Sequence, residues 1–142
     1  MSKALVNGTA FARLLDARFT VEDDGSIRAL VTVAAPLEGP PGYAHGGVLV
    51  ALLDEAMGAA VWYAGHRVLA VHLASDFKRP VPLGADIRIV GQVERREGRK
   101  LFTSGAIFLP DDTLAVSGSG IFVEAPQVLQ DISGFSFTHL SE

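Results

Sequence analysis

The chain of 142 residues contains no cysteine. Disulfide bonds, thiolate metal sites and cysteine nucleophiles are therefore excluded, and a reducing compartment such as the cytoplasm is the expected location. The first eight residues lack the apolar core of a secretory signal, so we expect no secretion. Dense runs of lysine and arginine are also absent and the formal net charge is −4, so we expect neither nucleic acid nor membrane as a partner.

Several common catalytic motifs are missing as well. The sequence has no Walker loop, no dinucleotide-binding fingerprint and no Gly-x-Ser-x-Gly elbow. Its four histidines, at positions 45, 66, 72 and 139, have none of the spacings that metal ligands show. We therefore predict a protein without metal or cofactor.

The chain is long enough for one domain with a substantial core, and 49% of its residues are hydrophobic. We predict a single domain over 1–142, with a core at 18–124, a short helix at 9–17 and a tail at 125–142 that is loose or contacts another subunit. In the short helix, Thr9 is the expected cap, and Phe11, Leu14 and Leu15 form the expected apolar face. Strands are expected at 18–22, 26–33, 68–77, 86–95, 100–108 and 113–123, and a second helix at 48–62. This order predicts an α+β fold in which a curved antiparallel sheet of five to six strands wraps around one helix.

The expected central helix is apolar on almost every face, which is typical of a helix that the fold surrounds. Its length, about 24 Å, is too short and its charge too high for a membrane span. Asp54 and Glu55 interrupt the apolar run, and an ionised carboxylate is costly to bury without a partner.

The helix opens with His45-Gly46-Gly47. The first N–H groups of a helix have no internal acceptor, and glycines would let a carbonyl oxygen that develops negative charge approach them closely. The glycines could equally serve only a tight corner between loop and helix, with His45 as a structural side chain.

Asp54 and Glu55 also allow a structural as well as a catalytic interpretation. In the structural one, a carboxylate reaches solvent or forms an ion pair at a subunit interface. His45 and Asp54 lie about 13 Å apart along a helix and about 180° around it, so the acid cannot serve its own helix start. Two antiparallel copies of the helix would bring the acid of one subunit to the glycines of the other. The residues thus favour an acyl-group site shared across a dimer, with a carboxylate as base or nucleophile.

The stretch His45-Gly-Gly-Val-Leu-Val-Ala-Leu-Leu-Asp54-Glu-Ala-Met-Gly58, followed by Ser75-Asp-Phe-Lys-Arg-Pro-Val-Pro-Leu-Gly84, resembles the hotdog-fold acyl-CoA thioesterases of the phenylacetate-pathway and 4-hydroxybenzoyl-CoA thioesterase-like branch. The resemblance covers residues 18–124 and implies a hotdog fold and dimers that pair into tetramers. It implies that Gly47 and Gly46 polarise the thioester carbonyl, that His45 helps to hold the thioester or the loop, and that Asp54 of the opposite subunit, or Glu55 beside it, acts as nucleophile or general base. It also implies an acyl-CoA substrate and no separate cofactor. We expect Phe77, Lys78, Arg79 and Pro80 to bind this substrate; the basic pairs at 78–79, 95–96 and 99–100 are either phosphate contacts or solvated turns.

Two positions depart from this pattern. Many members of the branch carry Asn or Gln where this chain has Gly39, and several carry Ser or Thr where it has Ala70. These losses motivate an alternative, a non-catalytic hotdog protein that binds acyl-CoA or a small lipid. A hotdog hydratase is a further alternative, but it would need a histidine paired with an acid, which His45 and Asp54 offer only across subunits.

Overall fold

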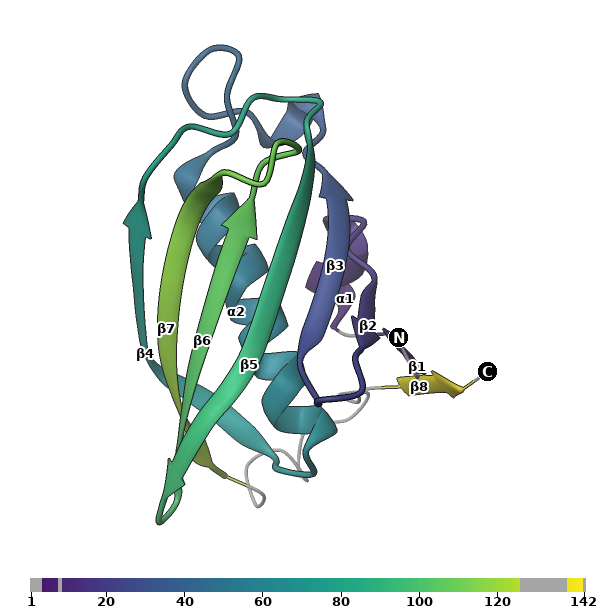
Figure 1. Cartoon of the computed structure of the whole chain (residues 1–142), viewed down its shortest axis with the longest axis vertical. Helices are drawn as coiled ribbons and strands as arrows, with labels where there is room; N and C mark the ends of the chain where they lie inside the picture. The colour runs from purple at the N-terminus through teal and green to yellow at the C-terminus, as the bar shows by residue number, and fades with distance from the viewer. Residues whose placement is uncertain (1–3, 8, 126–137, 142) are drawn as a thin grey trace.

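The computed structural model describes residues 4–7, 9–125 and 138–141 (Figure 1). The elements in chain order are β1 (Ala4–Asn7), α1 (Ala10–Leu14), β2 (Phe19–Val21), β3 (Ile27–Thr32), the 3₁₀ turn η1 (Ala35–Leu37), α2 (Gly46–Tyr63), β4 (Val68–Phe77), β5 (Asp86–Glu97), β6 (Lys100–Phe108), β7 (Leu114–Glu124) and β8 (Thr138–Ser141). The predicted strands and the central helix are all present, with ends that differ by at most two residues.

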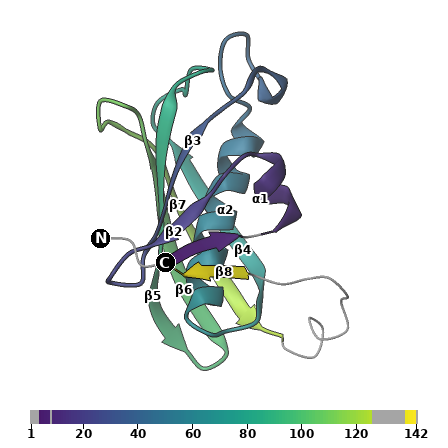
Figure 2. The ribbon, with the colours of Figure 1, turned by 90° about the vertical axis from the view of Figure 1, so that its right-hand side faces the viewer.

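The strands form one antiparallel sheet in the order β4-β7-β6-β5-β3-β2-β1-β8. The sheet curves around α2, which runs along its concave side (Figures 1 and 2). The predicted α+β architecture is therefore confirmed. Strands β2 to β7 make up the expected sheet of six, and the short strands β1 and β8 extend it beyond β2.

Helix α2 is held against the sheet by glycines on the facing strands. A Cβ atom at Gly91 of β5 would lie 2.6 Å from the backbone of Ala56, so only glycine permits this approach. Leu52, Leu53 and Met57 are fully buried in the resulting core. Among the described residues, α2 is the one helix whose length and apolar composition would suit a membrane span, so the prediction that it is too short and too charged for one is wrong. It packs here as the core helix of the fold.

Helix α1 differs from its prediction in the face that it buries. Thr9 caps it as expected, because its Oγ1 accepts a hydrogen bond of 3.1 Å from the N–H of Ala12. Phe11 and Leu14, however, are 46% and 74% exposed, whereas Ala12 and Leu15 are buried. The predicted apolar face is wrong because α1 is only five residues long and its orientation is set by a contact of Thr9 with α2, described below.

The predicted tail lies mostly outside the described residues, which omit 126–137. Its last described part, β8, pairs with β1 of the same chain, with Leu140 opposite Leu5. For these four residues the prediction of a loose end is wrong, because β8 pairs with β1. The contact with another subunit stays a prediction.

Candidate active site

At the start of α2, one glycine N–H is hydrogen-bonded and the other is not. His45 is the N-cap, and its Nδ1 accepts a hydrogen bond of 2.9 Å from the N–H of Gly47. The N–H groups of Val48 and Leu49 both bond to the carbonyl oxygen of His45. The N–H of Gly46 has no acceptor among the described residues. Gly46 is thus an open donor at the positive end of the helix dipole, whereas the N–H of Gly47, the predicted partner of the carbonyl, is occupied by His45.

The predicted substrate-binding residues lie at the same end of the molecule. A Cβ atom at Gly46 would lie 3.6 Å from the ring of Phe77, which is 54% exposed at the end of β4. The N–H groups of Lys78 and Arg79 both bond to the carbonyl oxygen of Ala115, at 2.7 and 3.1 Å, and so fix the chain as it leaves β4. The side chains of Lys78, Arg79 and Pro80 are exposed. The fold therefore places an aromatic ring beside the helix start, and two exposed cations follow it in the chain.

The loop before α2 explains why position 39 is glycine. A Cβ atom there would lie 2.7 Å from the Cα of His45, closer than real contacts of this kind. Two backbone bonds hold this tight arrangement, from Gly39 N–H to the oxygen of Tyr43 at 2.9 Å and from His45 N–H to the oxygen of Leu37 at 3.0 Å. No side chain, polar or otherwise, fits at position 39 in this loop. Ala70, the other departure, lies on β4 opposite Phe122 and offers only a methyl group.

Asp54 and Glu55 point to different sides of α2 and have different partners. The Oε1 of Glu55 accepts a hydrogen bond of 2.6 Å from the hydroxyl of Thr9. The carboxylate of Asp54 has no hydrogen-bond or ion-pair partner among the described residues. Burial raises the pKa of Asp54 above its ordinary value. Burial also raises the pKa of Glu55, with a smaller contribution from the charge of Asp54, while the bond from Thr9 acts in the opposite direction.

Within one chain the free acid and the open donor are too far apart to act on one carbonyl. Gly46 and Asp54 are eight residues apart, which places them about 80° apart around the helix and about 12 Å apart along its axis. If a second copy of α2 ran antiparallel to the first, Asp54 of each copy would lie beside Gly46 of the other.

Strand β4 is an end strand of the sheet and leaves a long apolar edge uncovered. Val71 is 61% exposed, and Leu69, Leu73 and Phe77 on the same strand are also exposed. Soluble proteins usually protect such an edge with charges or cover it with another chain. Sequence reasoning placed this strand correctly but did not anticipate that it would be open on both faces, because its apolar composition is that of a buried strand.

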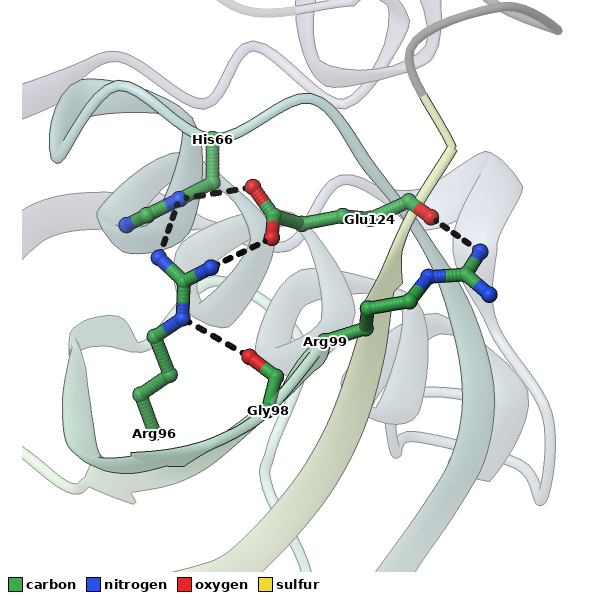
Figure 3. Close-up of polar contacts among 5 residues, drawn as sticks. All are labelled: His66, Arg96, Gly98, Arg99 and Glu124. Atoms are coloured by element: carbon green, nitrogen blue, oxygen red, sulfur yellow. Dashed lines mark hydrogen bonds and ion pairs between the residues drawn. The ribbon is translucent and has the colours of Figure 1, made fainter.

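A second polar cluster lies at the opposite end of α2 (Figure 3). Glu124 accepts a hydrogen bond of 2.7 Å from Arg96 and lies 3.1 Å from the Nδ1 of His66, while Arg99 bonds to the Glu124 carbonyl oxygen at 2.8 Å. These contacts join the end of β7 to the β5–β6 turn and to the loop after α2. Arg96 and Arg99, one residue from each of two basic pairs, thus make structural contacts here. Among the described residues no group of His, Asp or Glu could hold a metal ion.

Comparisons with known proteins agree with this geometry. The model of the thioesterase superfamily matches residues 41–116, more than half of the chain. The acyl-coenzyme A thioesterase THEM4 of Xenopus laevis is 40% identical over 89 residues, which cover 62% of this chain and 40% of that protein. The chain thus spans about two fifths of the length of this curated relative.

Solved structures show the same fold. A thioesterase superfamily protein has a TM-score of 0.73 and 36% identity, covering 76% of this chain and 53% of its own. The E. coli PaaI protein from the phenylacetic acid degradation operon has a TM-score of 0.77 at 23% identity, covering 82% and 85% of the two chains, which shows the shared hotdog fold. With the site at the helix start and the family model spanning it, the chain belongs to the thioesterase superfamily.

Proposed function

We propose that this protein hydrolyses acyl-CoA thioesters at a site that two antiparallel copies share. The observation that carries the proposal is the state of α2: a half-buried carboxylate without a partner at Asp54, and an open backbone donor at Gly46 on the glycine-rich start of the same helix. Relatives named acyl-coenzyme A thioesterases match 89 residues of the chain. The acyl-CoA identity of the substrate rests on those relatives.

The reaction follows from the charges at the two ends of the helix. The thioester oxygen lies at the N–H of Gly46, which stabilises the negative charge that develops on it. The N–H of Gly47 joins it in this proposal once its bond to Nδ1 of His45 is broken. Asp54 of the other subunit takes a proton from the attacking water, and its raised pKa makes it a stronger base than an ordinary aspartate. When the carbon–sulfur bond breaks, this proton passes to the leaving thiolate, so free acid and CoA are released.

Asp54 rather than Glu55 is the catalytic carboxylate in this proposal. The Glu55 carboxylate is engaged by Thr9 on the α1 side of the helix. The hydrogen bond from Thr9 would have to break before Glu55 could reach a substrate, whereas Asp54 has no such bond to break. Glu55 therefore serves to hold α1.

The dimer in this proposal is formed through β4 and the open side of α2. Pairing two β4 strands would cover the apolar edge at Leu69, Val71 and Leu73 and would satisfy its free backbone groups. An antiparallel pair of strands also requires the two α2 helices to run antiparallel, as the shared site needs. Lys78 and Arg79 at the end of β4 then supply positive charge for the phosphates of CoA.

A panel of acyl-CoA substrates with released thiol as the readout tests the function. Asp54→Asn should abolish turnover while the oligomer stays intact, and the matched variant Glu55→Gln should retain most of it. Wild-type turnover in Asp54→Asn would overturn the proposal.

Gly39 and Ala70 support a second candidate, a non-catalytic acyl-CoA binding protein. Neither position supplies the polar group found in many relatives of this branch, and at Gly39 the loop geometry forbids one. Tight binding of CoA esters without thiol release across the panel would favour this candidate.

A further inference from the structure

The convex face of the sheet carries a hollow on the side away from α2; this face is turned toward the viewer in Figure 1. The hollow has a volume of about 410 Å³ and is lined by residues of β3, β5 and β6. Successive residues of a strand point to opposite faces, and Ile87 and Ile89 of β5 are buried in the core. Arg88 and Val90, which alternate with them, therefore project from the convex face. Sites for small molecules have volumes of about 300–1,000 Å³, so this hollow is large enough for one.

The floor of the hollow consists of short apolar side chains. Val90 on β5 lies opposite Ala106 on β6 and, on its other side, opposite Arg28 on β3. Two residues before Val90, Arg88 lies opposite Phe108. Residues opposite each other in an antiparallel pair project to the same face, so the two short side chains lie between longer ones. The space that they leave has an apolar floor, an aromatic ring at one end and an arginine on the β3 side.

Two arginines line this hollow, and they differ in how far they are already bound. The guanidinium of Arg88 lies 4.9 Å from the centre of the Phe108 ring, and its Nη1 donates a hydrogen bond of 2.7 Å to Asp112. The side chain of Arg28 makes no hydrogen bond or ion pair among the described residues. Arg28 is thus the cation of this face whose N–H donors are all available.

Asp24 lies four residues before Arg28 but does not bind it. The Oδ1 of Asp24 accepts hydrogen bonds from the hydroxyl and the N–H of Ser26, at 2.6 and 2.9 Å. These bonds lower the pKa of Asp24, and the charge of Arg28 makes the smallest contribution to that shift. The carboxylate of Asp24 is therefore held by Ser26 and leaves the guanidinium of Arg28 to a ligand.

The other end of the hollow is already hydrogen-bonded. Gln92 and Ser104 line it, and both donate hydrogen bonds to Glu94. Glu94 would repel a negative charge in the hollow and the arginines would attract it, so such a charge belongs at the arginine end. One negative charge suits this end better than two, because Asp112 already pairs with Arg88.

We propose that this hollow binds a small organic acid, a single carboxylate on a flat apolar group. The planar guanidinium of Arg28 matches the two oxygens of a carboxylate. The apolar group covers Val90 and Ala106, which an inorganic anion would leave in contact with water. The site lies on the opposite face of the sheet from α2, so it does not depend on the proposed hydrolysis.

The test uses cinnamate as the probe and cinnamamide, which has the same shape without the charge, as its matched control. Methyl NMR signals of Val90 and Ala106 report where the probe binds, and calorimetry reports how tightly. Cinnamate should shift both signals and cinnamamide should not. Arg28→Gln should weaken cinnamate binding by about 10- to 100-fold, and Arg28→Lys, which keeps the charge but not the planar fork, by less. Arg18→Gln removes the same charge from an exposed residue outside the hollow and should bind as wild type does.

A second variant tests the apolar floor without changing a charge. Ala106→Leu fills the space above the floor and should also weaken cinnamate binding, with a melting temperature close to that of wild type. The proposal fails if cinnamate leaves the Val90 and Ala106 signals unmoved, if cinnamamide binds equally well, or if Arg28→Gln binds cinnamate as tightly as wild type does. It also fails if the two signals move with protein concentration but not with cinnamate, because the face is then an interface between copies of the chain.

Discussion

The hydroxyl of Thr9 lies 2.6 Å from Oε1 of Glu55, a residue 46 positions later in the chain. The same oxygen of Thr9 accepts the N–H of Ala12, so one hydroxyl both caps α1 and fastens it to the central helix. This contact also separates the two neighbouring acids of α2, because it engages Glu55 and leaves Asp54 without a partner.

Removing the Thr9 hydroxyl should loosen α1 without stopping catalysis. Thr9→Ala loses the cap and the bond to a half-buried carboxylate, so the free energy of unfolding should fall by about 1–3 kcal/mol. Thr9→Ser keeps both bonds and is the control. Urea unfolding measures the loss, and kcat of the folded variant should stay within a few-fold of wild type. A kcat as low as that of Asp54→Asn would show that α1 belongs to the catalytic site.

The buried acid should make the protein less stable as pH rises. The folded-state pKa of Asp54 is raised, so the folded state binds more protons than the unfolded state between the ordinary value of 3.8 and the raised value. The contribution of Asp54 to the free energy of unfolding is therefore largest below the ordinary pKa. It is lost as the pH rises through the raised folded-state pKa. Asp54→Asn should melt a few degrees higher than wild type at neutral pH, and the difference should vanish in acid.

Ionisation of Asp54 should also appear in catalysis, where activity rises with pH while stability falls. Asp54 acts as a base only when ionised, so kcat/KM should fall on the acid side, with a midpoint above the ordinary aspartate value. Glu55→Gln should leave this midpoint in place, because burial accounts for the raised pKa of Asp54. A midpoint that moves strongly or disappears in Glu55→Gln would argue that Glu55 is the titrating group.

The shared site can be tested by mixing two inactive variants. Gly46→Pro removes the open N–H, and proline is tolerated at the first position of a helix after an extended residue such as His45, which has φ −64° and ψ 134°. Asp54→Asn removes the acid. Subunits exchanged between the two should recover about one quarter of the wild-type rate, because half of the random dimers are mixed and each of these has one complete site. No recovery in verified mixed dimers would mean that each chain carries its own complete site.

Much of this architecture follows from local sequence pattern. The alternation of apolar residues located the strands, the continuous apolar run located α2, and His45-Gly46-Gly47 marked the helix start. Such features depend on neighbours a few residues away, whose preferences the sequence displays directly.

Only the tertiary structure decided how the site is completed. The freedom of Asp54 depends on Thr9 engaging Glu55 from another helix, and the exclusion of a side chain at Gly39 depends on how the loop folds back on His45. The hollow at Val90 and Ala106 depends on β3 lying beside β5, which brings Arg28 next to a strand far along the chain. Each of these is a contact between segments brought together by packing, and their spacing along the chain carries no local signal. The sequence by itself determined which elements form and where the reactive groups are attached, while the packing of those elements decided which groups are free to react.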